Sequence, residues 1–139
     1  YEVSNFAKTG YECRHNLNYW QRGEYAGFGA AAHSFINNER FYNTCNIDGY
    51  INNINGDIIC GKETITGKDA EFEYIMLGLR LEKGINLDNF KELFKEDFTV
   101  KYAKVLKKLN KFFVFNDGNV SISVSGFNVL NSILTEFVP

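Results

Sequence analysis

Proline, cysteine and long apolar runs are scarce in this sequence, and each scarcity argues against a class of protein. The single proline is residue 139, so no proline interrupts a helix in the interior. The three cysteines, Cys13, Cys45 and Cys60, are odd in number and widely spaced, which argues against a disulfide framework and for a reducing compartment. No apolar run approaches the roughly 20 residues that span a bilayer, and no signal-peptide pattern opens the sequence. We expect a cytoplasmic protein without a transmembrane segment.

The sequence also lacks a large excess of either positive or negative charge. The net charge of −2 and the pI of about 5.7 mean that the chain as a whole is not a polyanion binder. The hydrophobic content of 45% and charged content of 23% are typical of a globular protein, and 13 Phe and 8 Tyr can fill a core. The sequence opens at Tyr1 in a pattern that already alternates like a strand, so we interpret it as a fragment whose N-terminal partner is absent.

Secondary-structure signals are weak over the first 67 residues. We predict strands at residues 1–6, 25–29 and 40–43, a loop with a short helical turn at 11–25, and a helix at 46–53. A turn is predicted at Asn37-Asn38. Asp48 falls in the first turn of the predicted helix, where a negative charge suits the helix dipole. Residues 61–67 are polar and rich in threonine, and we predict a linker there.

From residue 68 onward, apolar residues recur at helical spacing. The first predicted helix carries Phe72, Ile75, Met76 and Leu79 on one face, with Gly84 as its C-cap. Further helices are predicted at 88–94, after a Thr99 cap, and after a Ser125 cap. The Asp-Gly at 117–118, flanked by alternating residues at 113–115 and 120–124, predicts a β-hairpin. Three helices, a hairpin and a closing helix are the order of a winged-helix-like module.

Both histidines and the only tryptophan lie in two short segments, R-H-N-L-N-Y-W at residues 14–20 and G-F-G-A-A-A-H-S at residues 27–34. Gly27 and Gly29 allow a close backbone approach to a ligand, although a GxG is also typical of a tight turn. His33 follows the small residues directly.

These segments resemble a known family. Residues 1–20, the following Y-x-G-F-G-A-A-A-H-S and an R-x-x-N segment resemble the C-terminal third of the HemW proteins, radical-SAM relatives of the oxygen-independent coproporphyrinogen III oxidase HemN. The specific part is H-N-x-x-Y-W, which is His15, Asn16, Tyr19 and Trp20 in this sequence. The downstream E-Y-I-M-L-G-L-R and V-L-N-S-I-L resemble the C-terminal domain of the family, so the resemblance covers essentially the whole chain.

The sequence departs from the family pattern at three positions. Ala30 and Ala31 stand where the family has proline and glycine, and Thr9 stands where proline is common. The first two changes bear on the rigidity of the glycine loop. They leave His15 and His33 untouched.

The resemblance implies a radical-SAM half-barrel that holds a [4Fe–4S] cluster through a C-x-x-x-C-x-x-C loop, with S-adenosylmethionine at the open iron. That loop is absent from this sequence, so the fragment alone is not expected to catalyse a reaction. The resemblance also makes His15 the candidate haem ligand, with Tyr19 and Trp20 as flat walls for a porphyrin. Gly27, Gly29 and His33 would lie near S-adenosylmethionine.

Each of these roles has an ordinary structural alternative. His15 can instead be a histidine hydrogen-bonded at the surface of a loop, and His33 can be buried beneath the glycine segment. Arg14 and Arg40 can meet carboxylates or can simply be solvated. The thiolate of Cys13, next to His15 in sequence, could compete as a haem ligand.

A lysine stripe supports a different hypothesis. The third predicted helix carries a stripe of five lysines, Lys101, Lys104, Lys107, Lys108 and Lys111. In a winged-helix module this helix is in the position of the recognition helix. The acidic total charge and the acids just upstream make nucleic acid an unlikely partner.

We therefore predict an α+β fragment. Residues 1–45 form the C-terminal edge of a radical-SAM (β/α) half-barrel, 46–67 a connecting helix and linker, and 68–139 a winged-helix-like domain with a β-hairpin. The predicted function of the parent protein is haem binding and haem trafficking, with haem or porphyrin and a haem-acceptor protein as partners. The alternatives are oxidative decarboxylation of coproporphyrinogen III to protoporphyrinogen IX and a nucleic-acid-binding module.

Overall fold

The computed structural model describes residues 1–138, which divide into two compact units. One unit contains residues 1–22 together with the chain from residue 68 onward, and the other contains residues 23–67. The smaller unit is thus inserted into the sequence of the larger one. Within the described residues, no helix has the length and apolar character needed to cross a bilayer.

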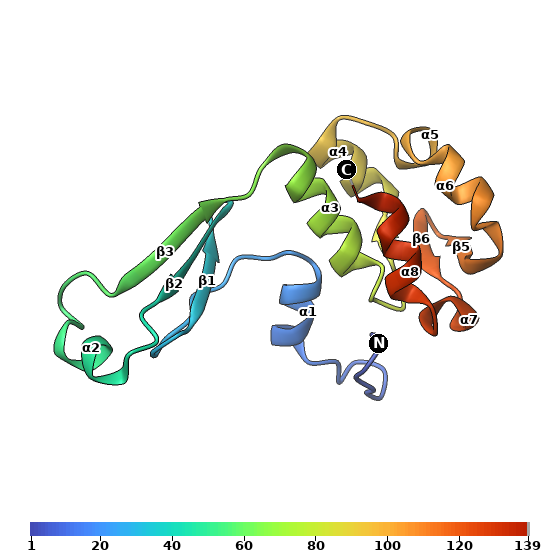
Figure 1. Cartoon of the computed structure of the whole chain (residues 1–139). Helices are drawn as coiled ribbons and strands as arrows, with labels where there is room; N and C mark the ends of the chain where they lie inside the picture. The colour runs from blue at the N-terminus through green and yellow to red at the C-terminus, as the bar shows by residue number, and fades with distance from the viewer. Residues whose placement is uncertain (139) are drawn as a thin grey trace. The chain divides into compact units, whose positions relative to one another are not determined.

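The larger unit is mainly helical and contains a small antiparallel sheet (Figure 1). It comprises α1 (Arg14–Trp20), α3 (Gly67–Gly78), β4 (Ile85–Asn86), α4 (Leu87–Phe94), α5 (Phe98–Lys101), α6 (Ala103–Lys108), the 3₁₀ turn η1 (Asn110–Phe112), β5 (Phe113–Asn116), β6 (Asn119–Ile122), α7 (Val124–Phe127), α8 (Leu130–Leu134) and η2 (Thr135–Phe137).

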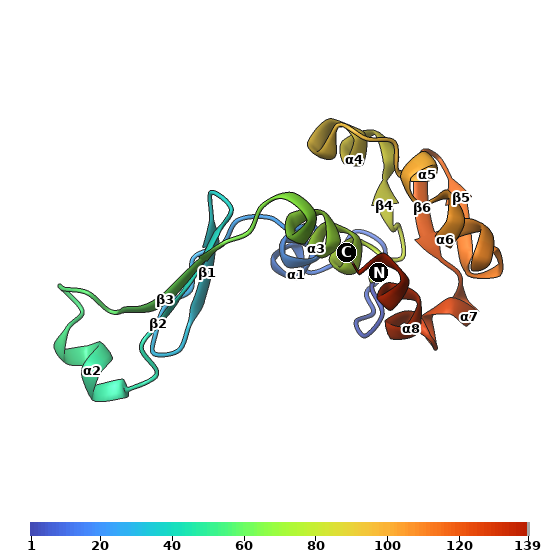
Figure 2. The same cartoon turned by 45° about the horizontal axis from the view of Figure 1, so that its top comes forward.

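The sheet of this unit has the strand order β4-β6-β5, and Figure 2 shows β4, β6 and β5 side by side. The short strand β4 pairs with β6, which is the second strand of the predicted hairpin. In chain order, this unit has helix α3, strand β4, the three helical segments α4, α5 and α6, and the hairpin. The α+β class is confirmed.

Aromatic and aliphatic side chains from every layer of the larger unit form one core. Fully buried members come from α3 (Ile75), β4 (Ile85), α4 (Phe90), α5 (Phe98) and β6 (Val120). Burying a side chain of this size contributes about 1.5–3 kcal/mol. All members of this core lie between residues 72 and 137, so none comes from residues 23–67.

The predicted C-cap of the first long helix is wrong. Helix α3 ends at Gly78, because the chain must turn there for β4 to reach β6. Gly78 is buried against Ile85, and a Cβ atom on it would crowd the Ile85 side chain. Gly84 instead lies in the turn before β4 with a φ of +69°, and a Cβ atom on it would collide with the carbonyl oxygen of Val120. The turn therefore requires a residue at position 84 that has no side chain and can adopt a positive φ.

Two predicted helix caps are also wrong, each by two residues. Asp97, rather than Thr99, caps α5 by accepting hydrogen bonds from the N–H groups of Thr99 and Val100. Ser123, rather than Ser125, caps α7. The predicted third and last helices are each divided. The third is interrupted at Tyr102, between α5 and α6, and the last at residues 128–129, between α7 and α8.

The smaller unit is a three-stranded antiparallel sheet of order β1-β2-β3. Its elements are β1 (His33–Ile36), β2 (Glu39–Asn43), α2 (Ile47–Asn52) and β3 (Ile59–Thr64). Asn37 and Asn38 both have positive φ, as a two-residue hairpin turn of type I′ requires. The predicted strand at 40–43, helix at 46–53 and turn at Asn37-Asn38 are confirmed.

Two other predictions for the first 67 residues differ from the structure. The predicted linker at 61–67 overlaps β3, whose residues are mostly exposed on both faces and so show no alternation. The predicted strands at 1–6 and 25–29 reduce to isolated bridges, Glu2 with Leu81 and Tyr25 with Phe35. The predicted short helical turn within 11–25 is confirmed and extends over seven residues as α1.

Candidate functional site

Helix α1 carries the H-N-x-x-Y-W segment, from just after its start to its last residue. It has seven residues, none of them buried, and Cys13 at its N-cap makes no side-chain cap hydrogen bond. An isolated helix of this length is unstable in water. Contacts with the rest of the larger unit must therefore hold it in place.

Three contacts hold α1. The Arg80 guanidinium lies over the Trp20 ring, 5.7 Å from the ring centroid. The Asn16 side-chain amide donates to the Tyr1 hydroxyl at 3.1 Å. Just after the helix, Arg22 pairs with Glu73 of α3 at 3.3 Å, and both side chains are largely buried. Asn16 and Trp20 therefore position the helix.

His15 lies on the exposed side of α1. Its ring meets the edge of the Tyr19 ring one turn further on, with the centroids 4.8 Å apart and the planes at 78°. Within residues 1–138, neither ring nitrogen of His15 makes a hydrogen bond. An exposed imidazole whose ring is held at one edge can bind a metal ion or carry a proton.

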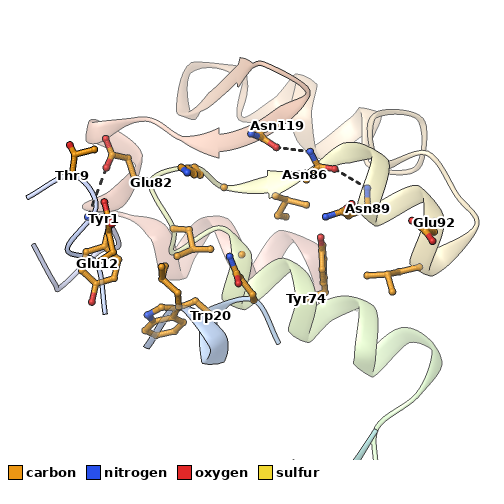
Figure 3. Close-up of a pocket in the computed structure, with 18 of the residues that line it drawn as sticks. Tyr1, Thr9, Glu12, Trp20, Tyr74, Glu82, Asn86, Asn89, Glu92 and Asn119 are labelled. Carbon is orange, nitrogen blue, oxygen red and sulfur yellow. Dashed lines mark hydrogen bonds and ion pairs between the residues drawn. The ribbon is translucent and has the colours of Figure 1, made fainter. Parts of the chain in front are cut away.

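Trp20 points elsewhere. With Leu17 and Tyr74 it lines a cavity of about 920 Å³, and His15 is not among the lining residues (Figure 3). The indole Nε1 of Trp20 is buried and has no hydrogen-bond partner among the described residues. The structure thus brings Tyr19, and not Trp20, against His15.

The glycine segment lies in the smaller unit, and its close approaches are made to the chain itself. A Cβ atom on Gly27 would collide with the carbonyl of His33, and the Gly27 N–H donates to the Ser34 hydroxyl at 3.0 Å. Gly29 has a φ of +108°. Its N–H donates to the Tyr50 hydroxyl at 3.1 Å, and its carbonyl accepts from the Asn43 amide at 2.9 Å. Close packing accounts for Gly27 and the positive φ accounts for Gly29, and their predicted role near S-adenosylmethionine stays a prediction.

His33 is exposed and stacks on Tyr42, with the ring centroids 5.2 Å apart and the planes at 29°. The Tyr42 ring lies over Gly61, where any side chain would collide with it. The row His33, Tyr42 and Gly61 follows the register of β1, β2 and β3. His33 is thus part of an aromatic ladder on the sheet rather than a buried residue.

The cysteines do not form a metal site. Cys13, Cys45 and Cys60 are all exposed and free. Within residues 1–138, no group of three His, Cys, Asp or Glu side chains could hold a metal ion. The residues present do not fit a [4Fe–4S] cluster, and no chemical step of this chain is derived from one.

The lysine stripe is partly neutralised by the chain's own acids. Lys101 pairs with Glu71 and Glu96, and Lys108 pairs with Glu136. The hydrogen bond from Lys101 to Glu71 raises the pKa of that lysine. The stripe therefore offers less free positive charge than the sequence indicates.

Sequence reasoning missed two features of the larger unit. Glu71 is buried on α3 and accepts hydrogen bonds from Lys101 at 2.8 Å and from the Tyr102 hydroxyl at 2.6 Å. The cavity wall formed by Asn86 and Asn89 was missed as well. The only signal in the sequence was asparagine at two positions three apart in I-N-L-D-N, which also fits an ordinary helix cap.

Comparison with known proteins relates the chain to one group. Residues 65–127 match the family model of the HemN C-terminal domain. The chain is 30% identical over 140 residues to "Heme chaperone HemW" of Lactococcus lactis, covering 99% of this chain and 37% of that protein. It is 37% identical over 111 residues to "Heme chaperone HemW" of Bacillus subtilis, covering 78% of this chain and 29% of that protein. The matched part of the chain therefore spans 29% to 37% of the length of these relatives.

Among solved structures, the chain is similar to coproporphyrinogen III oxidase (HemN) from Escherichia coli, described as a radical SAM enzyme. The TM-score is 0.64 at 16% identity, over 84% of this chain and 28% of that one. At this identity, the likeness supports the fold alone.

Proposed function

Because this chain belongs to the HemW-like family of radical-SAM proteins, whose C-terminal part it spans, we propose that its parent protein binds haem through His15 and passes it to an acceptor protein. The relatives named above carry the name haem chaperone, and this supports haem as the cargo. We place this activity in the cytoplasm.

The observation that carries the proposal is the exposed imidazole of His15 on a helix anchored at both ends. Haem iron takes a neutral imidazole nitrogen as an axial ligand, and the nitrogens of His15 are engaged by no other residue described here. The Tyr19 edge restricts the ring without covering it. An exposed ligand suits a cargo that must be handed on, because the acceptor can reach the iron.

The test is a haem titration of this chain and of the full-length parent, followed by absorbance in the Soret region. We expect a saturable band that His15→Ala abolishes. His33→Ala is the matched control, because His33 is also exposed and also contacts a tyrosine ring. Equal bands in the two variants would contradict His15 as the ligand.

The same full-length protein separates haem transfer from porphyrinogen oxidation. Turnover of coproporphyrinogen III without a haem band would favour the oxidase reaction over the chaperone. A [4Fe–4S] cluster and S-adenosylmethionine would have to be held by residues outside this chain, since the described cysteines provide no ligand set. Nucleic-acid binding is not favoured, since Lys101 and Lys108 are paired with acids.

A further inference from the structure

A groove beside α1 has no role in the proposed haem site. Figure 3 shows α1 and α3 along one side of it and β4 and α4 along the other. Its volume of about 920 Å³ is large enough for a ligand or a short peptide segment. Leu17, Leu81, Leu93 and the Tyr74 ring supply its apolar lining, and Leu93 is exposed although it is a large apolar side chain.

The charges along the groove favour a cationic occupant. Glu92 lies at one end in Figure 3, and Glu12 and Glu82 lie at the other. Lys83 is the only lysine or arginine among the lining residues. The terminal ammonium of Tyr1 also lies 3.9 Å from the Glu82 carboxylate, so three carboxylates face two cationic groups. Hydrogen bonds from its own backbone N–H and from that of Gly10 lower the pKa of Glu12, so this carboxylate is ionised at neutral pH. The excess of negative charge disfavours an anionic ligand such as a porphyrin propionate.

Two residues that line the groove carry a hydrogen-bond donor with no acceptor among the described residues. The Trp20 indole N–H is buried and unpartnered within residues 1–138, and a buried donor in this state is costly. The Asn89 side-chain amide lines the opposite wall, and it too makes no hydrogen bond to another described side chain or backbone group. A main-chain carbonyl of a bound segment can accept from the exposed Asn89 amide, which favours a peptide over a purely apolar molecule.

We propose that this groove is a docking site for a basic peptide segment of a partner protein. An apolar residue of the segment packs against Tyr74 and Leu93, and its lysine or arginine side chains reach Glu92 at one end and Glu12 and Glu82 at the other. The site goes beyond the proposed haem function and does not depend on it, because His15 does not line the groove.

The test uses the fluorescence of Trp20, the only tryptophan of the chain. The probe is the blocked peptide acetyl-Lys-Leu-Phe-Leu-Lys-amide, compared with the same peptide carrying glutamate in place of each lysine. We expect a saturable change with the basic peptide and none with the acidic one. Glu92→Gln should weaken binding of the basic peptide by about twofold to fivefold, as for the loss of one exposed charge pair.

Asp117→Asn is the matched control, because it also removes one exposed carboxylate but lies in the hairpin turn outside the groove. Equal affinities for the two peptides, no saturable change, or equal effects of Glu92→Gln and Asp117→Asn would each overturn the proposal. Circular dichroism of each variant checks that it is folded. Peptide binding that persists in His15→Ala would separate this site from the haem site. Absence of peptide binding alone would overturn the docking proposal, and absence of haem binding alone would overturn the proposed function.

Discussion

The residues of the H-N-x-x-Y-W segment differ in their surroundings, and the differences separate ligand from support. His15 is exposed with open ring nitrogens, and Tyr19 touches its edge. Asn16 and Trp20 instead bind Tyr1 and Arg80, which fixes the helix. The four residues of the motif therefore have different roles. His15 is the candidate ligand, Tyr19 restrains its ring, and Asn16 and Trp20 anchor the helix.

Another residue-scale feature is the buried carboxylate of Glu71, which joins α3 to α5 and the residue after it. Tyr102→Phe removes the hydroxyl that donates to Glu71 at 2.6 Å and leaves only the lysine partner. We expect a loss of about 1–2 kcal/mol in the free energy of unfolding, measured by urea denaturation. Tyr11→Phe, at a tyrosine that is 81% exposed, should change little. Equal effects would mean that the hydrogen bond contributes nothing.

The same tyrosine predicts a pH dependence. Burial and the hydrogen bond to Glu71 raise the pKa of Tyr102, so the folded phenol keeps its proton at pH values where the unfolded one, with a pKa of about 10, has lost it. This contribution to stability is complete below about pH 10 and declines as the pH rises further. Unfolding curves above pH 10 should therefore show a steeper loss of stability in the wild type than in Tyr102→Phe.

At the scale of elements, the turn between α3 and β4 decides the topology of the larger unit. It brings β4 beside β6, and Gly84 is the point of closest approach because its Cα faces the Val120 carbonyl. A side chain there would separate β4 from the sheet. The three-stranded sheet thus depends on a glycine that sequence reasoning assigned to a helix end.

Two glycines with similar backbones allow this to be measured. Gly84 has a φ of +69° and no room for a side chain, while Gly118, in the hairpin turn, has a φ of +73° and open space around it. Gly118→Ala should cost about 1–2 kcal/mol for the left-handed backbone. Gly84→Ala should cost that amount and roughly 1–3 kcal/mol more for the collision. Equal losses in thermal or urea unfolding would show that the approach at Gly84 is not restrictive.

At the scale of the whole molecule, residues 23–67 form a unit inserted between two parts of another. The core of the larger unit takes no side chain from the insertion. His15 belongs to the larger unit, and the glycine segment and His33 belong to the insertion. The two segments singled out in the sequence therefore belong to separately packed bodies.

Replacing residues 23–67 by a flexible Gly/Ser linker of about ten residues should leave the larger unit folded. We expect a cooperative unfolding transition and a helical circular dichroism spectrum, because every core contact is kept. The haem band assigned to His15 should persist. Loss of cooperative unfolding would contradict this expectation. It would show that residues 23–67 stabilise the larger unit although they add no side chain to its core.

The sequence by itself determined the elements whose signal is local. The hairpin at Asp117-Gly118 and the Asn37-Asn38 turn follow from residues that tolerate a positive φ, and α4 follows from apolar spacing. The candidate ligand His15 was identified from a motif of consecutive residues. Such features need no knowledge of what lies across the fold.

Only the tertiary structure decided the features that depend on residues distant in sequence. The end of α3 at Gly78 was set by β4 pairing with β6, and β3 was recognisable only beside β2. Trp20 packs against Arg80, which lies 60 residues further along the chain, and not against His15. Local patterns report a preference of the backbone, whereas contacts between distant segments are made only when the chain has closed around its core.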